Sequence, residues 1–276
     1  LTDVNLVVVD FYADNPGRCA YMNDRANGFK ITLTPPKPTV WQGKYRLTKR
    51  DYFAASNARN TAFCFAPDGY IAYVDDLSVL MPKWFSRVRE AIKHARVTCG
   101  AYKKATKLVV EDGIAVSWDE EKIDSRWNLG RDDQPIPITG GALYGCSLVL
   151  PTDFVLKVNG WDEDCDRMGG EDWVFGIMLE KWGCPLVYDR SMLTFESDEA
   201  HSEGPVFNRI DKGKSPNDAS HRMLKWVTKE GRRQAPNYFG ISGIGGLRRR
   251  ILRGEDFPIA QNPQHCWYDG QALTEM

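Results

Sequence analysis

One sixteen-residue stretch, residues 160–175, constrains this chain more than any other part of it. It holds six carboxylates, three glycines and two tryptophans. The pair Gly169-Gly170 stands directly before the acidic pair Glu171-Asp172, and apolar residues at helical spacing follow as far as Gly183. We predict a helix that begins at Glu171, because carboxylates are favoured in a first helical turn. The glycines let backbone approach a ligand closely, although the acids could also serve only as helix caps.

Two apolar runs that end in aspartate precede this stretch. Residues 4–10 end in Asp10, and residues 70–74 are followed by Asp75-Asp76. Such runs are typical of buried parallel strands, and open α/β sheets bind ligands at the carboxyl ends of their strands. Adjacent carboxylates repel each other unless a cation relieves them. A hard divalent metal that holds a diphosphate is therefore a physical reason for Asp75-Asp76, while Asp10 could equally be a turn former.

The remaining segments are read more coarsely. We predict an amphipathic helix over residues 84–96 and a polar loop over residues 119–133, whose aromatic residues could contact substrate. Residues 247–253 are a basic, helix-like patch. Such a patch could contact an anionic acceptor, nucleic acid included, or could be an ordinary solvated face.

The acidic stretch and the second strand occur together in a known family. Residues 160–163 and 170–175 resemble the "GWDE…GGEDxxF" segment of GT-A glycosyltransferases. They are most similar to the family-2 group and to the galactosyltransferase C-terminal segment. Ala58-Arg59-Asn60 and residues 69–76 resemble the family's "ARN" and "DxD" motifs, in the family's order and at its usual spacing. The resemblance covers about residues 4–203.

The resemblance implies a fold and a domain division. We expect an α/β GT-A domain over residues 1–204, with a mostly parallel nucleotide-binding sheet flanked by helices, and a C-terminal extension over residues 205–276. The strand and helix that open the family's fold have no counterpart before residue 4. The fold is therefore expected to begin one unit late, or the chain to be truncated.

The resemblance also assigns acceptor-side roles. It implies that Asp172 is the general base that deprotonates the acceptor hydroxyl, and that Glu171 holds acceptor hydroxyls. It further implies that Trp161 offers a stacking surface to a sugar ring. The expected reaction is transfer of a sugar from a nucleotide-sugar donor, with a UDP-sugar as the first candidate, and with inversion at the anomeric carbon.

On the donor side the resemblance implies four binding residues, namely Asp10, Arg59, Asp75 and Asp76. Asp76 and His201 would hold a divalent metal, Mn²⁺ or Mg²⁺, since carboxylate and neutral imidazole both suit such ions. Leu77 stands where many family members carry a third acidic residue. This departure leaves open a catalytically weak sugar- or nucleotide-binding module. A nucleotidyltransferase, which shares nucleotide-binding sheets, is the other alternative.

Bulk properties narrow the partners and the compartment. The net charge of −1 gives no global field that would steer the chain to nucleic acid or membrane. The expected acceptor is a glycan or small molecule, with nucleic acid as the alternative. Seven cysteines without a C-x-x-C pair indicate neither a disulfide framework nor a zinc cluster. No apolar run is long enough to span a membrane, so we expect a cytoplasmic protein, unless an N-terminal anchor has been lost.

Overall fold

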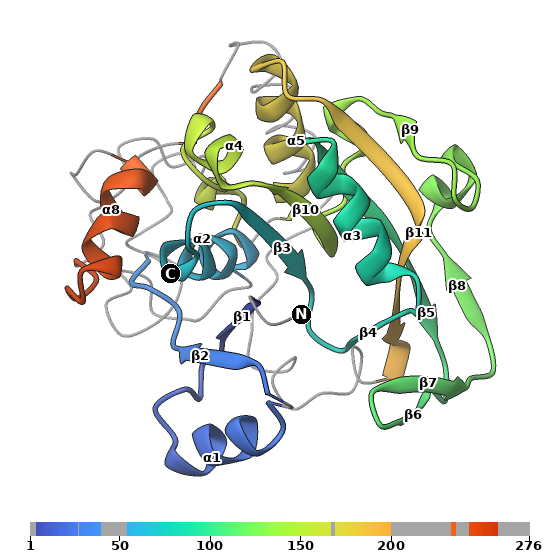
Figure 1. Cartoon of the computed structure of the whole chain (residues 1–276), viewed down its shortest axis with the longest axis horizontal. Helices are drawn as coiled ribbons and strands as arrows, with labels where there is room; N and C mark the ends of the chain where they lie inside the picture. Colours follow the sequence, from blue (N-terminus) through green and yellow to red (C-terminus); the bar gives the residue numbers. More distant parts are fainter. Residues whose placement is uncertain are drawn as a thin grey trace, which may run out of the picture.

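The computed structural model describes residues 4–26, 28–39, 54–166, 169–199, 233–235 and 243–258. A central sheet carries helices on both faces (Figure 1), which confirms the predicted α/β class. The strands are β1 (Asn5–Val9), β2 (Lys30–Thr34), β3 (Tyr70–Val74), β4 (Ser78–Leu80), β5 (Val97–Ala105), β6 (Val109–Glu111), β7 (Ile114–Ser117), β8 (Glu121–Ile123), β9 (Ile136–Pro137), β10 (Ser147–Pro151) and β11 (Leu186–Ser197). The helices are α1 (Pro16–Asp24), α2 (Ala55–Phe65), α3 (Trp84–Lys93), α4 (Thr152–Lys157), α5 (Glu171–Lys181) and α8 (Gly243–Leu252), with 3₁₀ turns η1 (Ser125–Leu129), η2 (Gly140–Ala142) and η3 (Glu163–Cys165).

The central sheet has seven strands, and most of its neighbouring pairs are antiparallel. The main order is β3-β10-β5-β11-β4, with β8 beside β5 and β9 beside β11. Among the described strands of this sheet only the β5–β11 pair is parallel, and β10 is antiparallel to both β3 and β5. The predicted mostly parallel pairing is thus corrected. β3, β5 and β11 do share one direction, but no helix of the crossover kind joins β5 to β10, so the chain returns in the opposite direction.

Alternate side chains of β10 build the cores on the two faces of the sheet. Leu148 and Leu150 join the larger core, together with Phe63 of α2 and Phe175 of α5. Val149 points to the other face, where Trp84 of α3 and Met192 pack with it. This follows from strand geometry, since successive side chains of a strand point to opposite faces. The sheet is therefore covered by α3 on one face and by α2 and α5 on the other.

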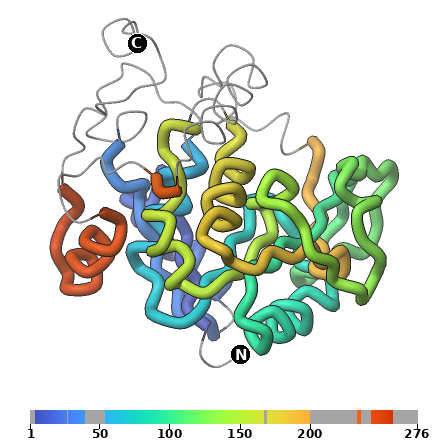
Figure 2. The backbone as a smooth tube through the Cα atoms, turned by 90° about the horizontal axis from the view of Figure 1, so that it is seen from above, coloured from blue at the N-terminus to red at the C-terminus, as the bar shows by residue number. Residues whose placement is uncertain are grey.

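The two ends of the described chain lie at the periphery. β1 and β2 form a separate two-stranded parallel sheet, and α8 packs on α2 through the fully buried Leu247. Figure 2 shows α8 at one end of the molecule and the green β6–β9 region at the other. No helix among the described residues is long and apolar enough to cross a membrane.

Only part of the predicted basic patch is open to solvent, since Arg249 and Arg253 are exposed but Arg248 is not. Arg248 is buried and donates two hydrogen bonds, of 2.9 and 2.7 Å, to the carbonyl of Ala66 at the end of α2. It also pairs with Asp68 at 2.8 Å, and Arg250 pairs with Glu255 at 2.9 Å. Arg248 therefore anchors α8 to the core instead of facing an acceptor, because a guanidinium can satisfy an orphan carbonyl at a helix end.

Candidate active site

The acidic stretch divides into a structural half and a half that faces the candidate site. Asp166 accepts hydrogen bonds from the backbone amides of Ser56 and Asn57 at 2.8 and 3.1 Å. It thereby caps α2, which has no side-chain cap of its own. Glu163 forms an ion pair of 2.5 Å with the fully buried Lys37. The first acidic group therefore holds the fold together, because these carboxylates satisfy buried donors.

The glycine pair forms the turn that leads into α5. Gly169 and Gly170 have φ angles of 79° and 83°, values that residues with a Cβ atom rarely adopt. The chain then enters α5 at Glu171, as predicted. Consecutive helical residues point in directions about 100° apart, so Glu171 and Asp172 face different partners.

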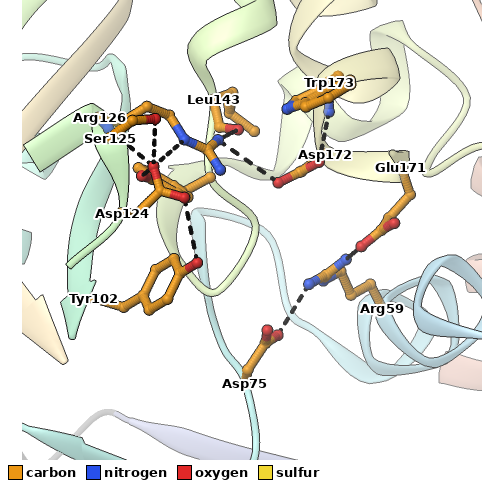
Figure 3. Close-up of polar contacts among 11 residues, drawn as sticks. Arg59, Asp75, Tyr102, Asp124, Ser125, Arg126, Leu143, Glu171, Asp172 and Trp173 are labelled. Carbon is orange, nitrogen blue, oxygen red and sulfur yellow. Dashed lines mark hydrogen bonds and ion pairs between the residues drawn. The ribbon is translucent and has the colours of Figure 1, made fainter. Parts of the chain in front are cut away.

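Arg59 joins the two sequence motifs. Its guanidinium donates to the carboxylate of Asp75 at the end of β3 at 2.9 Å, and to that of Glu171 at 2.8 Å (Figure 3). Burial on its own would lower the pKa of Arg59, but the carboxylates of Asp75 and Glu171 outweigh this and raise it. A permanent cation thus links the candidate donor side, at Asp75, to the candidate acceptor side, at Glu171.

Asn60, the last residue of the "ARN" motif, has a structural role. Its side chain donates to the carbonyl of Trp161 at 2.9 Å and accepts from the amide of Trp161 at 2.8 Å. This reciprocal pair fixes the backbone that leads into the acidic stretch, in the way that a strand neighbour would.

The predicted sugar-stacking role of Trp161 is wrong. Its side chain is 1% exposed, the ring of Phe175 stacks on it at 3.9 Å between centroids, and Arg59 lies 4.6 Å from its centroid. A ring enclosed in this way has no face left for an acceptor. Burial of the large apolar surface of tryptophan stabilises the core. There the Trp161 ring packs against the guanidinium of Arg59.

Asp172 lies where a base could operate. Its carboxylate accepts from the Trp173 amide at 2.9 Å and lies 3.9 Å from the Arg126 guanidinium. Burial and the neighbouring charge of Glu171 raise the pKa of Asp172 to about 6, although Arg126 and Arg59 oppose the rise. A carboxyl with such a pKa is ionised at neutral pH and is a stronger base than an ordinary aspartate.

Arg126 and its partners were missed by sequence reasoning. Arg126 lies in η1, inside the loop of residues 119–133, and donates to Asp124 at 3.2 Å and to the Leu143 carbonyl at 2.9 Å. It lies 3.1 Å from the centroid of the Tyr144 ring, and the Tyr144 hydroxyl donates to Asp124. The sequence indicated only that a polar loop of this length is often functional. Asp124 and Arg126 do not belong to a helical or strand pattern in the sequence, so nothing in the sequence indicates that they lie beside Asp172.

Asp75 and Asp76 are both exposed at the end of β3, as the strand reading predicted. Adjacent carboxylates offer the oxygen ligands that Mn²⁺ or Mg²⁺ prefer, so this donor set fits such an ion in part. Among the described residues no three metal-ligating side chains are grouped closely enough to hold one alone. The remaining ligands would come from a diphosphate, from water or from His201, which lies outside the described residues.

Two further acidic residues bear on the donor side. Glu196 of β11 was not predicted, and burial together with the charges of Asp75 and Asp76 raises its pKa to about 7. Asp10 pairs with Arg18 at 2.6 Å and accepts from the Tyr12 amide at 2.9 Å. Asp10 thus ends β1 as expected, in the separate small sheet, and its contact with a nucleotide base stays a prediction.

Comparison with known proteins bears on the fold. Neither protein-family models nor curated protein sequences give a match. Among solved structures, GalNAc-T7 with UDP, GalNAc and Mn²⁺ is similar with a TM-score of 0.53 and 14% identity, over 83% of this chain and 43% of that one. TarS of S. aureus, residues 1–349 with UDP-GlcNAc, is similar with a TM-score of 0.52 and 13% identity, over 82% and 57%. Both are GT-A glycosyltransferases.

The chain has a GT-A fold. It spans about half the length of these two neighbours. At such low identity the similarity establishes the architecture, and the chemistry has to be argued from the residues of this chain.

Proposed function

We propose that this protein is a glycosyltransferase that moves a sugar from a UDP-sugar to an acceptor hydroxyl with inversion. The observation that carries the proposal is the Arg59 bridge, since it brings Asp75 and Glu171 into one site from motifs far apart in sequence. The GT-A fold supports it. The two similar structures contain UDP with GalNAc, and UDP-GlcNAc, so UDP-N-acetylhexosamines are the first donors to test.

Asp172 would be the general base. The acceptor hydroxyl forms a bond to the anomeric carbon as the bond from that carbon to the diphosphate oxygen breaks. The hydroxyl proton passes to Asp172, and UDP leaves with the electron pair of the broken bond. Attack opposite the leaving group inverts the anomeric carbon. Glu171 would bind acceptor hydroxyls while its bond to Arg59 fixes its position.

Asp75 and Asp76 would hold the donor and a divalent cation. When bound, Mn²⁺ or Mg²⁺ supplies positive charge opposite the leaving diphosphate. The exposure of both aspartates at the end of β3 leaves room for a diphosphate. His201 is proposed as a further metal ligand on the resemblance alone.

The test compares Asp172→Asn with the wild type. Release of UDP from UDP-GlcNAc and UDP-GalNAc would be measured with Mn²⁺, using water and simple sugars as acceptors. Asn keeps the size of the side chain and its bond with the Trp173 amide but is not a base. Transfer should fall by roughly two to four orders of magnitude, while UDP-sugar affinity stays near normal.

The control is Asp112→Asn, the same substitution at an exposed turn of the β6–β7 hairpin. It should transfer at the wild-type rate. Transfer by Asp172→Asn at close to the wild-type rate would show that Asp172 is not the base. The anomeric configuration of the product, read by NMR, tests inversion separately, and a retained configuration would exclude it.

A further inference from the structure

The carboxylate of Asp172 faces a small set of charged and titratable groups. Glu171 precedes it on α5, and Arg59 faces it from α2 but is already bound to Glu171 at 2.8 Å. The thiols of Cys99 and Cys146 are nearby, and burial raises the pKa of both, so they stay neutral. Among the described residues the ion pair that reaches Asp172 comes from Arg126, at 3.9 Å between Nη1 and Oδ2.

A separation of 3.9 Å is short enough for ionic attraction and too long for a hydrogen bond. The distinction matters for a base. A guanidinium bonded directly to Asp172 would occupy the oxygen that has to accept the proton of the substrate. At the observed distance the cation favours the ionised carboxylate and leaves that oxygen available.

Three contacts hold the guanidinium at this distance. Asp124 begins η1 and accepts from both the amide and the Nε of Arg126, at 2.9 and 3.2 Å. The carbonyl of the fully buried Leu143 accepts from Nη1 at 2.9 Å. The ring of Tyr144 lies against the guanidinium, with 3.1 Å between the guanidinium carbon and the ring centroid. Figure 3 shows Arg126 together with Asp124, Leu143 and Asp172.

Asp124 is itself fixed as an anion. The hydroxyl of Tyr144 donates to it, and that of Tyr102 donates at 3.4 Å. Burial tends to raise its pKa, but bonds from the Arg126 amide and the Tyr144 hydroxyl outweigh this and lower the pKa to about 2. Asp124 therefore competes with Asp172 for Arg126 at every working pH.

We propose that Arg126, tethered by Asp124, Leu143 and Tyr144, is a positioning residue that keeps Asp172 ionised without bonding to its proton-accepting oxygen. The proposal rests on the proposed role of Asp172 as general base. Besides capping η1, Asp124 then has a second role, since its bond to the Arg126 side chain sets the distance between the guanidinium and Asp172.

The test follows the titration of Asp172 directly, so that it does not depend on turnover. The full chain is labelled with ¹³C at the aspartate carboxyl carbons, and the Asp172 signal is the one missing from Asp172→Asn. In Arg126→Gln the titration midpoint should rise by about one to three pH units, because a facing cation lowers a carboxyl pKa by about that amount. Arg126→Lys keeps the charge and should stay near the wild-type midpoint.

Asp124→Asn should move the midpoint in the opposite direction. Without its anionic tether Arg126 can close on Asp172, which lowers the midpoint and, because the base oxygen is then engaged, also slows UDP release from UDP-GlcNAc. Damage to the fold would not shift the two variants in opposite directions. The matched control is Arg131→Gln, which removes an exposed charge from the same loop of residues 119–133 and should leave the midpoint unchanged.

A folded Arg126→Gln with the wild-type midpoint would overturn the proposal. If Arg126→Gln does not fold, an unchanged or raised midpoint in Asp124→Asn has the same meaning. The role of Asp172 is judged separately, by the transfer rate of Asp172→Asn. Loss of transfer there with unmoved midpoints in the other variants would leave the glycosyltransferase function standing and remove only the role of Arg126.

Discussion

Replacement of Asp172 by asparagine should stabilise the protein at neutral pH, even as it removes the proposed base. The native structure raises the pKa of Asp172 from 3.8 to about 6, so the folded chain binds this proton more tightly than the unfolded chain. Unfolding then releases a proton between about pH 4 and pH 6, and stability falls as the pH rises through that window.

The size of the effect follows from the same shift. A rise from 3.8 to about 6 corresponds to a destabilisation of the ionised form by roughly 3 kcal/mol, at about 1.4 kcal/mol for each pKa unit. Solvent reaches the side chain, which is 21% exposed, so this figure is an upper bound. Asparagine resembles the protonated carboxyl and does not ionise. The variant should therefore gain up to roughly 3 kcal/mol at pH 8.

Urea unfolding, followed by tryptophan fluorescence, measures the difference at two pH values. The gain of Asp172→Asn over the wild type should be present at about pH 8 and fall toward zero near pH 4. Asp112→Asn should differ from the wild type by no more than about 0.5 kcal/mol at either pH. Equal or lower stability of Asp172→Asn at pH 8 would refute the reasoning, and a gain that persists at pH 4 would assign it to packing instead of charge.

Three further predictions concern packing, a buried ion pair and the metal. A Cβ at Gly140 would lie 2.4 Å from the backbone of Gly176 in α5, whereas one at Gly141 would meet open space. Gly140→Ala should therefore lower the free energy of unfolding by about 1–3 kcal/mol, whereas Gly141→Ala should hardly change it. Denaturation curves measure both losses, and equal losses would disprove this prediction. Lys37→Met should cost about 3–5 kcal/mol because it leaves Glu163 buried without its cation, and Lys37→Met with Glu163→Met should recover most of that loss in the same assay. UDP release should cease in excess EDTA and return with Mn²⁺, and full activity in EDTA would remove the metal from the mechanism.

Residues at the ends of regular elements were the most predictable part of the site. The strand before Asp75 and the helix that begins at Glu171 are both found at the predicted residues. Their signals are local, since an apolar run that ends in aspartate or an acidic pair after two glycines needs no knowledge of distant residues. The order of the two motifs then placed them in one fold.

Features that depend on distant partners could not be predicted in this way. Asp166 and Glu163 are acidic residues like Glu171 and Asp172, yet Asp166 is bound to α2 and Glu163 to Lys37. Trp161 is of a residue type that can stack on a sugar ring, but it lies in the core. The antiparallel pairing of β10 also differs from the mostly parallel sheet that was expected, because a buried apolar strand has the same pattern whether its neighbours are parallel or antiparallel.

The two adjacent acids of α5 show why sequence alone gives their positions but not their chemistry. Glu171 accepts a hydrogen bond of 2.8 Å from Arg59, so one of its oxygens is engaged by a cation. Asp172 faces its own arginine at 3.9 Å, and burial leaves it with a pKa of about 6. A carboxylate with a raised pKa and no direct bond to a cation accepts a proton more readily, and of this pair Asp172 has the raised pKa and holds its arginine beyond hydrogen-bond distance. The choice between the two thus depends on a difference of about 1 Å in the placement of two guanidinium groups, which arise from α2 and from η1 and are brought to α5 only by the complete fold.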